Sequence, residues 1–175
     1  MRAALTTALL LGLGGLGYAT VLGFAAAGSA DLLRHTTVAI FATLVTLLAH
    51  SMTMFYLLGK GRAIREAAEE GGLPATFYAA VARARRPVFS VGMLAMGLTM
   101  AAAIIGGGVD TGAVPTGVHT LLAASAIAAN LAMLRAELTA MQVASDTVLE
   151  VNALLERQAE GPGETESPGE TENPG

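Results

Sequence analysis

Histidine is the side chain best suited to chemistry in this chain of 175 residues, which has no cysteine and three histidines, His35, His50 and His119. The missing thiol excludes disulfides, thiolate metal sites and cysteine nucleophiles. An imidazole can bind a metal ion or haem iron, or carry a proton near neutral pH. Neither a Walker A sequence nor an HExxH motif occurs. Three hypotheses about chemistry therefore start from these histidines.

His35 and His119 form the first candidate pair, because both are expected near the same surface of a helical bundle, on different helices. Two histidines on facing helices can hold a b-type haem between them. The alternative is that both are interfacial histidines near lipid headgroups, and the neighbouring Arg34 and Asp31 favour this alternative. The haem hypothesis predicts a membrane electron-transfer subunit.

His50 is the second candidate, because it lies inside the apolar stretch 36–58. It is eight residues from the end of this stretch at Leu58, which is about 12 Å along a helix. Met93 and Met96 are expected at a similar depth, and thioether and imidazole ligands suit a soft metal such as Cu(I). Methionines at helical spacing are also ordinary packing residues. Both interpretations remain open.

A polar stripe is expected around His50, formed with Thr43, Thr46 and Thr53 of the same apolar stretch. Asn130 is expected to face this stripe from another helix, with alanines around it that permit close approach. An ionisable residue inside a membrane span predicts a functional site, here a relay for protons or a polar ligand. The alternative is a neutral imidazole that forms one interhelical hydrogen bond and fixes the register of two helices.

The elements that position these residues are apolar. Hydrophobic residues make up 53% of the chain and charged residues 14%, against about 25% charged in soluble domains. A membrane span needs about 20 apolar residues. Four stretches reach about that length, at 3–28, 36–58, 87–105 and 114–134. Residues 1–134 are therefore predicted to form an all-α bundle of four transmembrane helices, with Arg135 and Glu137 marking the exit of the last.

The loop 59–86 carries six basic residues and predicts the orientation. The positive-inside rule places this loop, and with it both termini, in the cytoplasm. We expect this membrane to be a bacterial inner membrane, and an organellar membrane is the alternative. A cleaved signal peptide after Ala30 is the alternative for the N-terminus, but the first apolar stretch is longer than such a peptide requires.

The same loop is predicted to be helical. A short helix over 62–70 ends at Gly71-Gly72, and Pro74 can open a second helix. The second helix either lies in the headgroup region before Pro87 begins the third span or forms a solvated connector.

Two further segments suggest contacts beyond the bundle core. Small residues recur every four positions along the first stretch, which predicts a close packing face. Residues 135–159 are predicted to be a cytoplasmic amphipathic helix, which either forms a short coiled coil or folds back on the loop. Its expected seam is Leu134, Leu138, Met141, Ser145, Val148, Asn152 and Leu155. Residues 160–175 form a two-copy acidic repeat, predicted to be disordered.

The function expected from these features is that of a non-enzymatic integral membrane protein. Its partners would be the lipid bilayer and either other membrane subunits or a second copy of itself. No carboxylate is expected at depth within a span, which argues against hydrolytic chemistry. Nucleic acid is not an expected partner, because the net charge of −4 arises from five glutamates after residue 159. The alternatives are the haem protein and the metal or relay site at His50.

Overall fold

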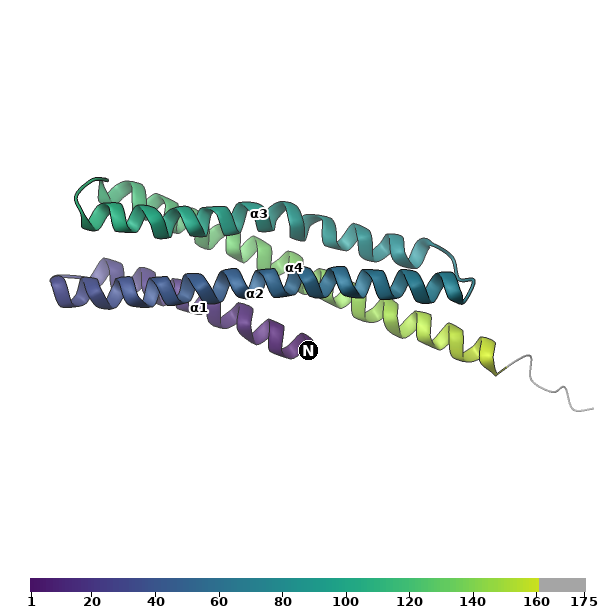
Figure 1. Ribbon diagram of the computed structural model, residues 1–175. Helices are drawn as coiled ribbons and strands as arrows, with labels where there is room; N and C mark the ends of the chain where they lie inside the picture. Colours follow the sequence, from purple (N-terminus) through teal and green to yellow (C-terminus); the bar gives the residue numbers. More distant parts are fainter. Residues whose placement is uncertain (161–175) are drawn as a thin grey trace, which may run out of the picture.

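A computed structural model describes residues 1–160 as four α-helices (Figure 1). They are α1 (Arg2–Ala25), α2 (Ser29–Glu70), α3 (Thr76–Asp110) and α4 (Thr116–Ala159). This described part of the chain contains no strand, and each helix is long and apolar enough to cross a membrane. The predicted all-helical class with four membrane-length helices is thus confirmed. The acidic repeat predicted over 160–175 lies, beyond its first residue, outside the described residues.

The four helices form two hairpins, α1–α2 and α3–α4, whose turns lie at the same end of the molecule (Figure 1). We call this the histidine end, because His35 and His119 lie just after the two turns. The turn between α2 and α3 and the end of α4 lie at the opposite end, which we call the arginine end. Helix α1 is the shortest and stops partway along α2. The arginine half of the molecule is therefore built mainly from α2, α3 and α4.

Small residues bring α1 and α2 together. A Cβ atom added to Gly12 would lie 2.7 Å from the Thr46 hydroxyl, and one added to Gly15 would lie 2.9 Å from the Ala42 Cβ. The ridge of small residues on the first helix therefore packs on α2 within the same chain. At the other end of α1, Leu5 and Leu9 join the hydrophobic core that includes Met133 of α4.

Helices α2 and α3 each continue without a break from the apolar belt into the arginine end. The separate loop helices expected around 62–70 and after Pro74 are instead extensions of these two helices. Pro87 lies within α3, where it is exposed while the adjacent Val88 is fully buried. A proline on the outer side of a helix leaves the packed face intact. The predicted break at Gly71-Gly72 is present, and Gly72 has a φ of 63°.

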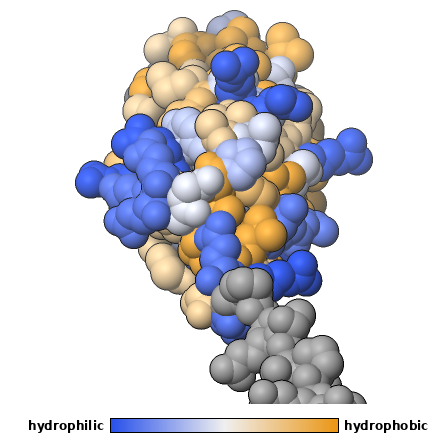
Figure 2. All heavy atoms as spheres, turned by 90° about the vertical axis from the view of Figure 1, so that its right-hand side faces the viewer, coloured by the Kyte–Doolittle hydropathy of each residue, from blue (hydrophilic) through white to orange (hydrophobic). Residues whose placement is uncertain are grey.

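Helix α4 continues without a break beyond the apolar belt and packs against α3 and α2. Its buried residues from Met133 onward are Met133, Glu137, Ala140, Met141, Ala144, Thr147 and Val151. Met141 belongs to the predicted seam, and the other six each lie one position before a residue of that seam. Near the end of the helix, Leu155 packs against Gly71 in the α2–α3 turn. Seen from this end, hydrophilic side chains gather around a centre of apolar ones (Figure 2).

Candidate functional site

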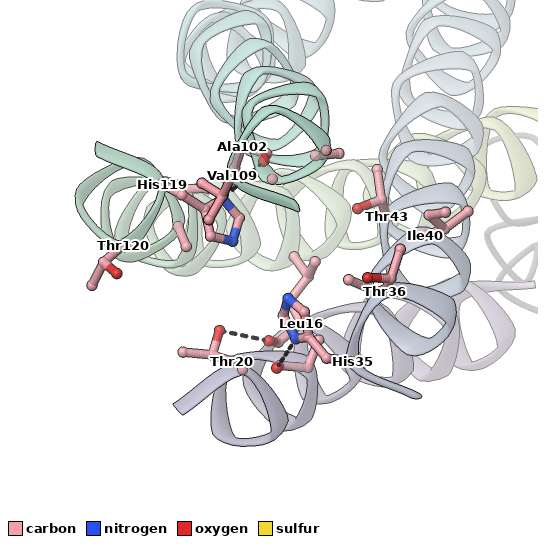
Figure 3. A pocket seen from close by; sticks show the side chains of 18 of the residues that line it. Leu16, Thr20, His35, Thr36, Ile40, Thr43, Ala102, Val109, His119 and Thr120 are labelled. Carbon is pink, nitrogen blue, oxygen red and sulfur yellow. Dashed lines mark hydrogen bonds between the residues drawn. The ribbon is translucent and has the colours of Figure 1, made fainter. Parts of the chain in front are cut away.

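His35 and His119 face each other across the space between the two hairpins (Figure 3). Their ring centroids are 6.2 Å apart, and the ring planes are inclined by 78°. His35 comes from the start of α2 and His119 from the start of α4. The structure thus brings together the two histidines that the sequence analysis paired.

Backbone carbonyl groups fix both rings in the same tautomer. His35 Nδ1 lies 2.8 Å from the Ala19 carbonyl oxygen. His119 Nδ1 lies 3.1 Å from the Ala102 carbonyl oxygen. A carbonyl can only accept, so each Nδ1 carries a proton, and Nε2 is the nitrogen that is left to bind a ligand. Both Nε2 atoms point into the gap between the rings (Figure 3).

A glycine provides room for each ring. A Cβ atom on Gly23 would lie 2.9 Å from His35 Cε1, and one on Gly106 would lie 3.0 Å from His119 Cε1. With a side chain at Gly23 the His35 ring would have to shift, and with one at Gly106 the His119 ring would have to move by a few tenths of an ångström. The two hairpins therefore hold their histidines in the same way.

The two hairpins share a short repeat of residue types in the sequence. Each hairpin has an alanine and a glycine four residues apart, and then a His-Thr pair followed by alanines four and seven residues after the histidine. The repeat comprises Ala19, Gly23, His35, Thr36, Ala39 and Ala42 in the first hairpin and Ala102, Gly106, His119, Thr120, Ala123 and Ala126 in the second. The repeat places His35 and His119 at equivalent positions of the two hairpins. It was not among the features from which the two histidines were paired.

A cavity of about 340 Å³ lies between the hairpins at this end and is lined by both histidines. Its volume is within the usual range for small-molecule sites. Most of its wall consists of alanine, glycine and aliphatic side chains, and threonine hydroxyls and Asp110 add polar groups. Helices α1 and α3 make no contact with each other. The hairpins meet through α2–α3, α2–α4 and α1–α4, and the cavity lies on the side where α1 and α3 are apart.

The histidine pair supplies two nitrogen donors, fewer than a structural zinc site needs. No cluster of three or more His, Asp or Glu residues suited to a metal occurs within residues 1–160. A structural zinc site needs four protein ligands. In haem, by contrast, the porphyrin supplies four nitrogens and the protein only the axial ligands. Two metal–nitrogen bonds of about 2.0 Å, plus the distance from each nitrogen to its ring centre, place the centroids about 6 Å apart.

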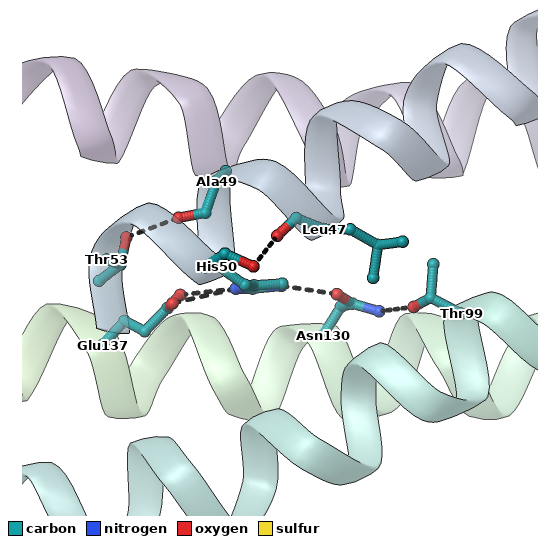
Figure 4. Close-up of polar contacts among 8 residues, drawn as sticks. Leu47, Ala49, His50, Thr53, Thr99, Asn130 and Glu137 are labelled. Atoms are coloured by element: carbon teal, nitrogen blue, oxygen red, sulfur yellow. Dashed lines mark hydrogen bonds and ion pairs between the residues drawn. The ribbon is translucent and has the colours of Figure 1, made fainter. Parts of the chain in front are cut away.

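His50 lies in a separate buried network further along α2 (Figure 4). His50 Nδ1 is 3.0 Å from both carboxylate oxygens of Glu137. His50 Nε2 is 2.8 Å from Asn130 Oδ1, and Asn130 Nδ2 donates to Thr99 Oγ1 at 2.8 Å. All four residues are at most 3% exposed. The network ties α2, α3 and α4 together.

Fixed acceptors determine the direction of these hydrogen bonds. Asn130 Nδ2 also donates to the Ala126 carbonyl, so the amide oxygen must face His50 and accept from Nε2–H. His50 Nδ1 and the Glu137 carboxyl group share one further proton, whichever of them carries it. His50 thus has no lone pair free for a metal. Met93 is 70% exposed, so the structure does not assemble the donor set of His50, Met93 and Met96.

Glu137 corrects one expectation from the sequence. It was expected to mark the exit of the fourth span, with no carboxylate at depth, but its side chain is fully buried beside His50. Two heptad patterns, one residue apart, fit the sequence of α4. The predicted seam follows the pattern that contains Leu138, whereas the buried face follows the pattern that contains Glu137. Glu137 lies seven residues after Asn130, and this spacing places both on the face of α4 that meets His50.

The threonines of the predicted polar stripe have local roles. Thr46 and Thr53 donate to carbonyl groups one turn earlier in α2, as threonines in helices commonly do. Thr43 lines the cavity at the histidine end. Thr99 also lines this cavity and donates to the Ala95 carbonyl. Because an amide is a poor carrier of protons, the link through Asn130 favours positioning over a proton relay.

No protein-family model matches the chain, and neither the curated proteins nor the solved structures contain a match.

Proposed function

We propose that this protein is a membrane-embedded electron-transfer subunit that binds one b-type haem between its two hairpins, with His35 and His119 as axial ligands. The observation that carries the proposal is the arrangement of the two rings. Their centroids lie 6.2 Å apart, and both Nδ1 atoms are engaged by carbonyl groups. A histidine ligand commonly donates its other ring N–H to such a carbonyl, which orients the ring and raises its basicity.

The donor set favours electron transfer over catalysis. His35 and His119 would hold the iron of a bound haem through their two Nε2 atoms and would leave it no position for oxygen or a substrate. The haem would supply one-electron redox chemistry. The protein groups that tune its potential are the axial ligands, their hydrogen bonds and the burial of the site.

The walls of the cavity suit a flat macrocycle. Alanines and glycines from all four helices line it, and these small side chains allow a ring to approach the helix backbones. Thr36, Thr116 and Thr120 line the same cavity. The Thr36 hydroxyl donates to Asp110 and the Thr120 hydroxyl donates to the Thr116 carbonyl, so both hydroxyls face a ligand as acceptors. The site is thus apolar around the ring, with hydroxyl groups within its wall.

The membrane setting is supported by the four apolar helices and by the charge at the arginine end. Exposed Phe41, Leu44, Leu48 and Phe55 along α2 are the surface that lipid would cover. Under the positive-inside rule the arginine end and both termini are cytoplasmic, and the haem lies near the opposite surface. An electron carrier with one haem implies redox partners, which are further membrane subunits or proteins docking at that surface.

An absorption spectrum tests this proposal directly. The full-length protein, purified in mild detergent after expression with added haem precursor, is expected to show a Soret band and, when reduced, sharp α and β bands, with one haem per chain. Absence of a Soret band after supplementation with haem would refute the proposal. The bundle would then remain a structural subunit or accessory factor of a membrane complex.

Gly106→Ala is expected to weaken haem binding, because the new methyl group would displace the His119 ring from its place against α3. An outer-shell change of this kind costs about 10–100-fold in affinity. Gly97→Ala is the matched control on the same helix, since nothing lies within 4 Å of its added Cβ. A haem titration of the two variants measures their affinities. Equal affinities would contradict a role for the position of the His119 ring in haem binding.

A further inference from the structure

A second pocket lies near the arginine end, on the outer side of α2 and α3. Its volume is about 300 Å³, and it is lined by Leu58, Arg62, Arg65, Tyr78 and Arg85. Three of these five side chains are guanidinium groups, which bind phosphate through paired N–H donors. The pocket shares no lining residue with the cavity at the histidine end.

Tyr78 organises the arginines. Arg85 Nη2 donates to the Tyr78 hydroxyl at 3.0 Å, and the Arg85 guanidinium carbon lies 5.6 Å from the centre of the ring. The guanidinium carbon of Arg65 lies 6.0 Å from the same centre. Both groups therefore lie over one aromatic ring, where cation–π attraction favours them.

Gly61 allows Arg85 to reach this position across α2. A Cβ atom on Gly61 would lie 2.9 Å from Arg85 Nη1. Gly61 is buried in the middle of a helix, where glycine costs about 1 kcal/mol relative to alanine. The structure shows the Arg85 side chain passing close to the backbone at this glycine.

The pocket carries excess positive charge. Arg62 pairs with Glu66 at 2.7 Å, and Arg65 pairs with Glu69 at 3.6 Å. The hydrogen bond and the charge of Glu66 raise the pKa of Arg62 above its ordinary value, so this group stays cationic. Arg85 forms none of the ion pairs found within residues 1–160. One guanidinium therefore has only a neutral hydroxyl partner.

The position of the pocket along α2 points to the source of its ligand. Leu58 forms its apolar side and is 41% exposed, and Phe55, one turn before it, is 72% exposed. Arg62 and Arg65 begin the charged surface on the other side. In the proposed membrane setting, this junction lies at the level of the cytoplasmic headgroups. Basic pockets between helices at that level bind acidic headgroups.

We propose that this pocket binds the phosphate group of an anionic phospholipid, with Arg65 and Arg85 as the main donors and Leu58 against the acyl chain. The proposal rests on the membrane setting but not on haem. In this proposal the pocket arginines bind a defined ligand, in addition to setting the orientation of the helices in the membrane.

Native mass spectrometry of the full-length protein in detergent tests this proposal, with added phosphatidylglycerol, phosphatidylcholine or inorganic phosphate. The wild-type protein is expected to retain one phosphatidylglycerol in preference to phosphatidylcholine. Arg85→Gln is expected to lower its retention at least about fivefold, the effect of one basic residue near an anionic surface. Tyr78→Phe, which keeps the ring but removes the hydroxyl partner of Arg85, is expected to give a smaller loss.

Arg86→Gln is the matched control, because it removes an exposed arginine at the next position of α3 that does not line the pocket. Equal losses in Arg85→Gln and Arg86→Gln would overturn the proposal in favour of general charge attraction. Displacement of the lipid by inorganic phosphate at equal concentration would assign the pocket to a free anion and overturn the lipid source. Recovery of the chain from the soluble fraction without detergent would refute the membrane setting instead.

Discussion

Alanine in place of either His35 or His119 is expected to abolish the six-coordinate haem spectrum, and alanine at both positions is expected to abolish haem binding. Each single variant keeps one ligand and leaves a five-coordinate, high-spin iron. Loss of a direct ligand should exceed the roughly 10–100-fold cost of losing an outer-shell partner. Haem titrations followed by absorption check the affinity and the spin state together.

Rescue by imidazole separates a lost ligand from a lost fold. His119→Ala leaves room for the missing ring beside Gly106, so added imidazole should restore the low-spin spectrum. His50→Leu with Glu137→Leu is the control, because it removes a histidine from the buried network and changes neither a proposed ligand nor a residue that lines the cavity. A normal haem spectrum in His35→Ala or His119→Ala would contradict the assignment of ligands.

His50→Leu is expected to destabilise the bundle more than Glu137→Leu, and the double variant is expected to recover most of the loss. His50→Leu leaves a buried carboxyl group without its partner, which costs about 3–5 kcal/mol. Glu137→Leu leaves a neutral imidazole that still donates to Asn130, so only one ring nitrogen lacks a partner, at about 1–3 kcal/mol.

Unfolding in mixed micelles of detergent and denaturant measures the free energies of the four proteins. Replacing both partners with apolar side chains is often neutral or stabilising, so the double variant should lie near the wild type. Additive losses in the double variant would show that the two side chains act independently. That result would contradict the direct contact between His50 and Glu137.

Much of the fold follows from hydropathy and from glycine. The four apolar stretches predict the four helices, and Gly71-Gly72 predicts the turn between α2 and α3. Helix continuity through Pro87 is harder to predict. The helix continues because Pro87 lies on its exposed side. The sequence around Pro87 does not show which side of the helix is packed.

The candidate site was predicted in part. The pairing of His35 with His119, and that of His50 with Asn130, follow from helix depth and from matching faces. Glu137 was missed because charge suggested an exit from the membrane, whereas the heptad spacing from Asn130 pointed inward. The internal repeat was missed because its positions are few and small residues are common throughout the chain.

The most direct test of the account is the near-infrared magnetic circular dichroism of the ferric, haem-loaded protein, which identifies the axial ligands of low-spin iron. The account predicts the charge-transfer band of bis-histidine coordination in the wild-type protein and its loss in His35→Ala and in His119→Ala. A haem-loaded wild-type protein with any other ligand pair, or a chain that binds no haem, would contradict it.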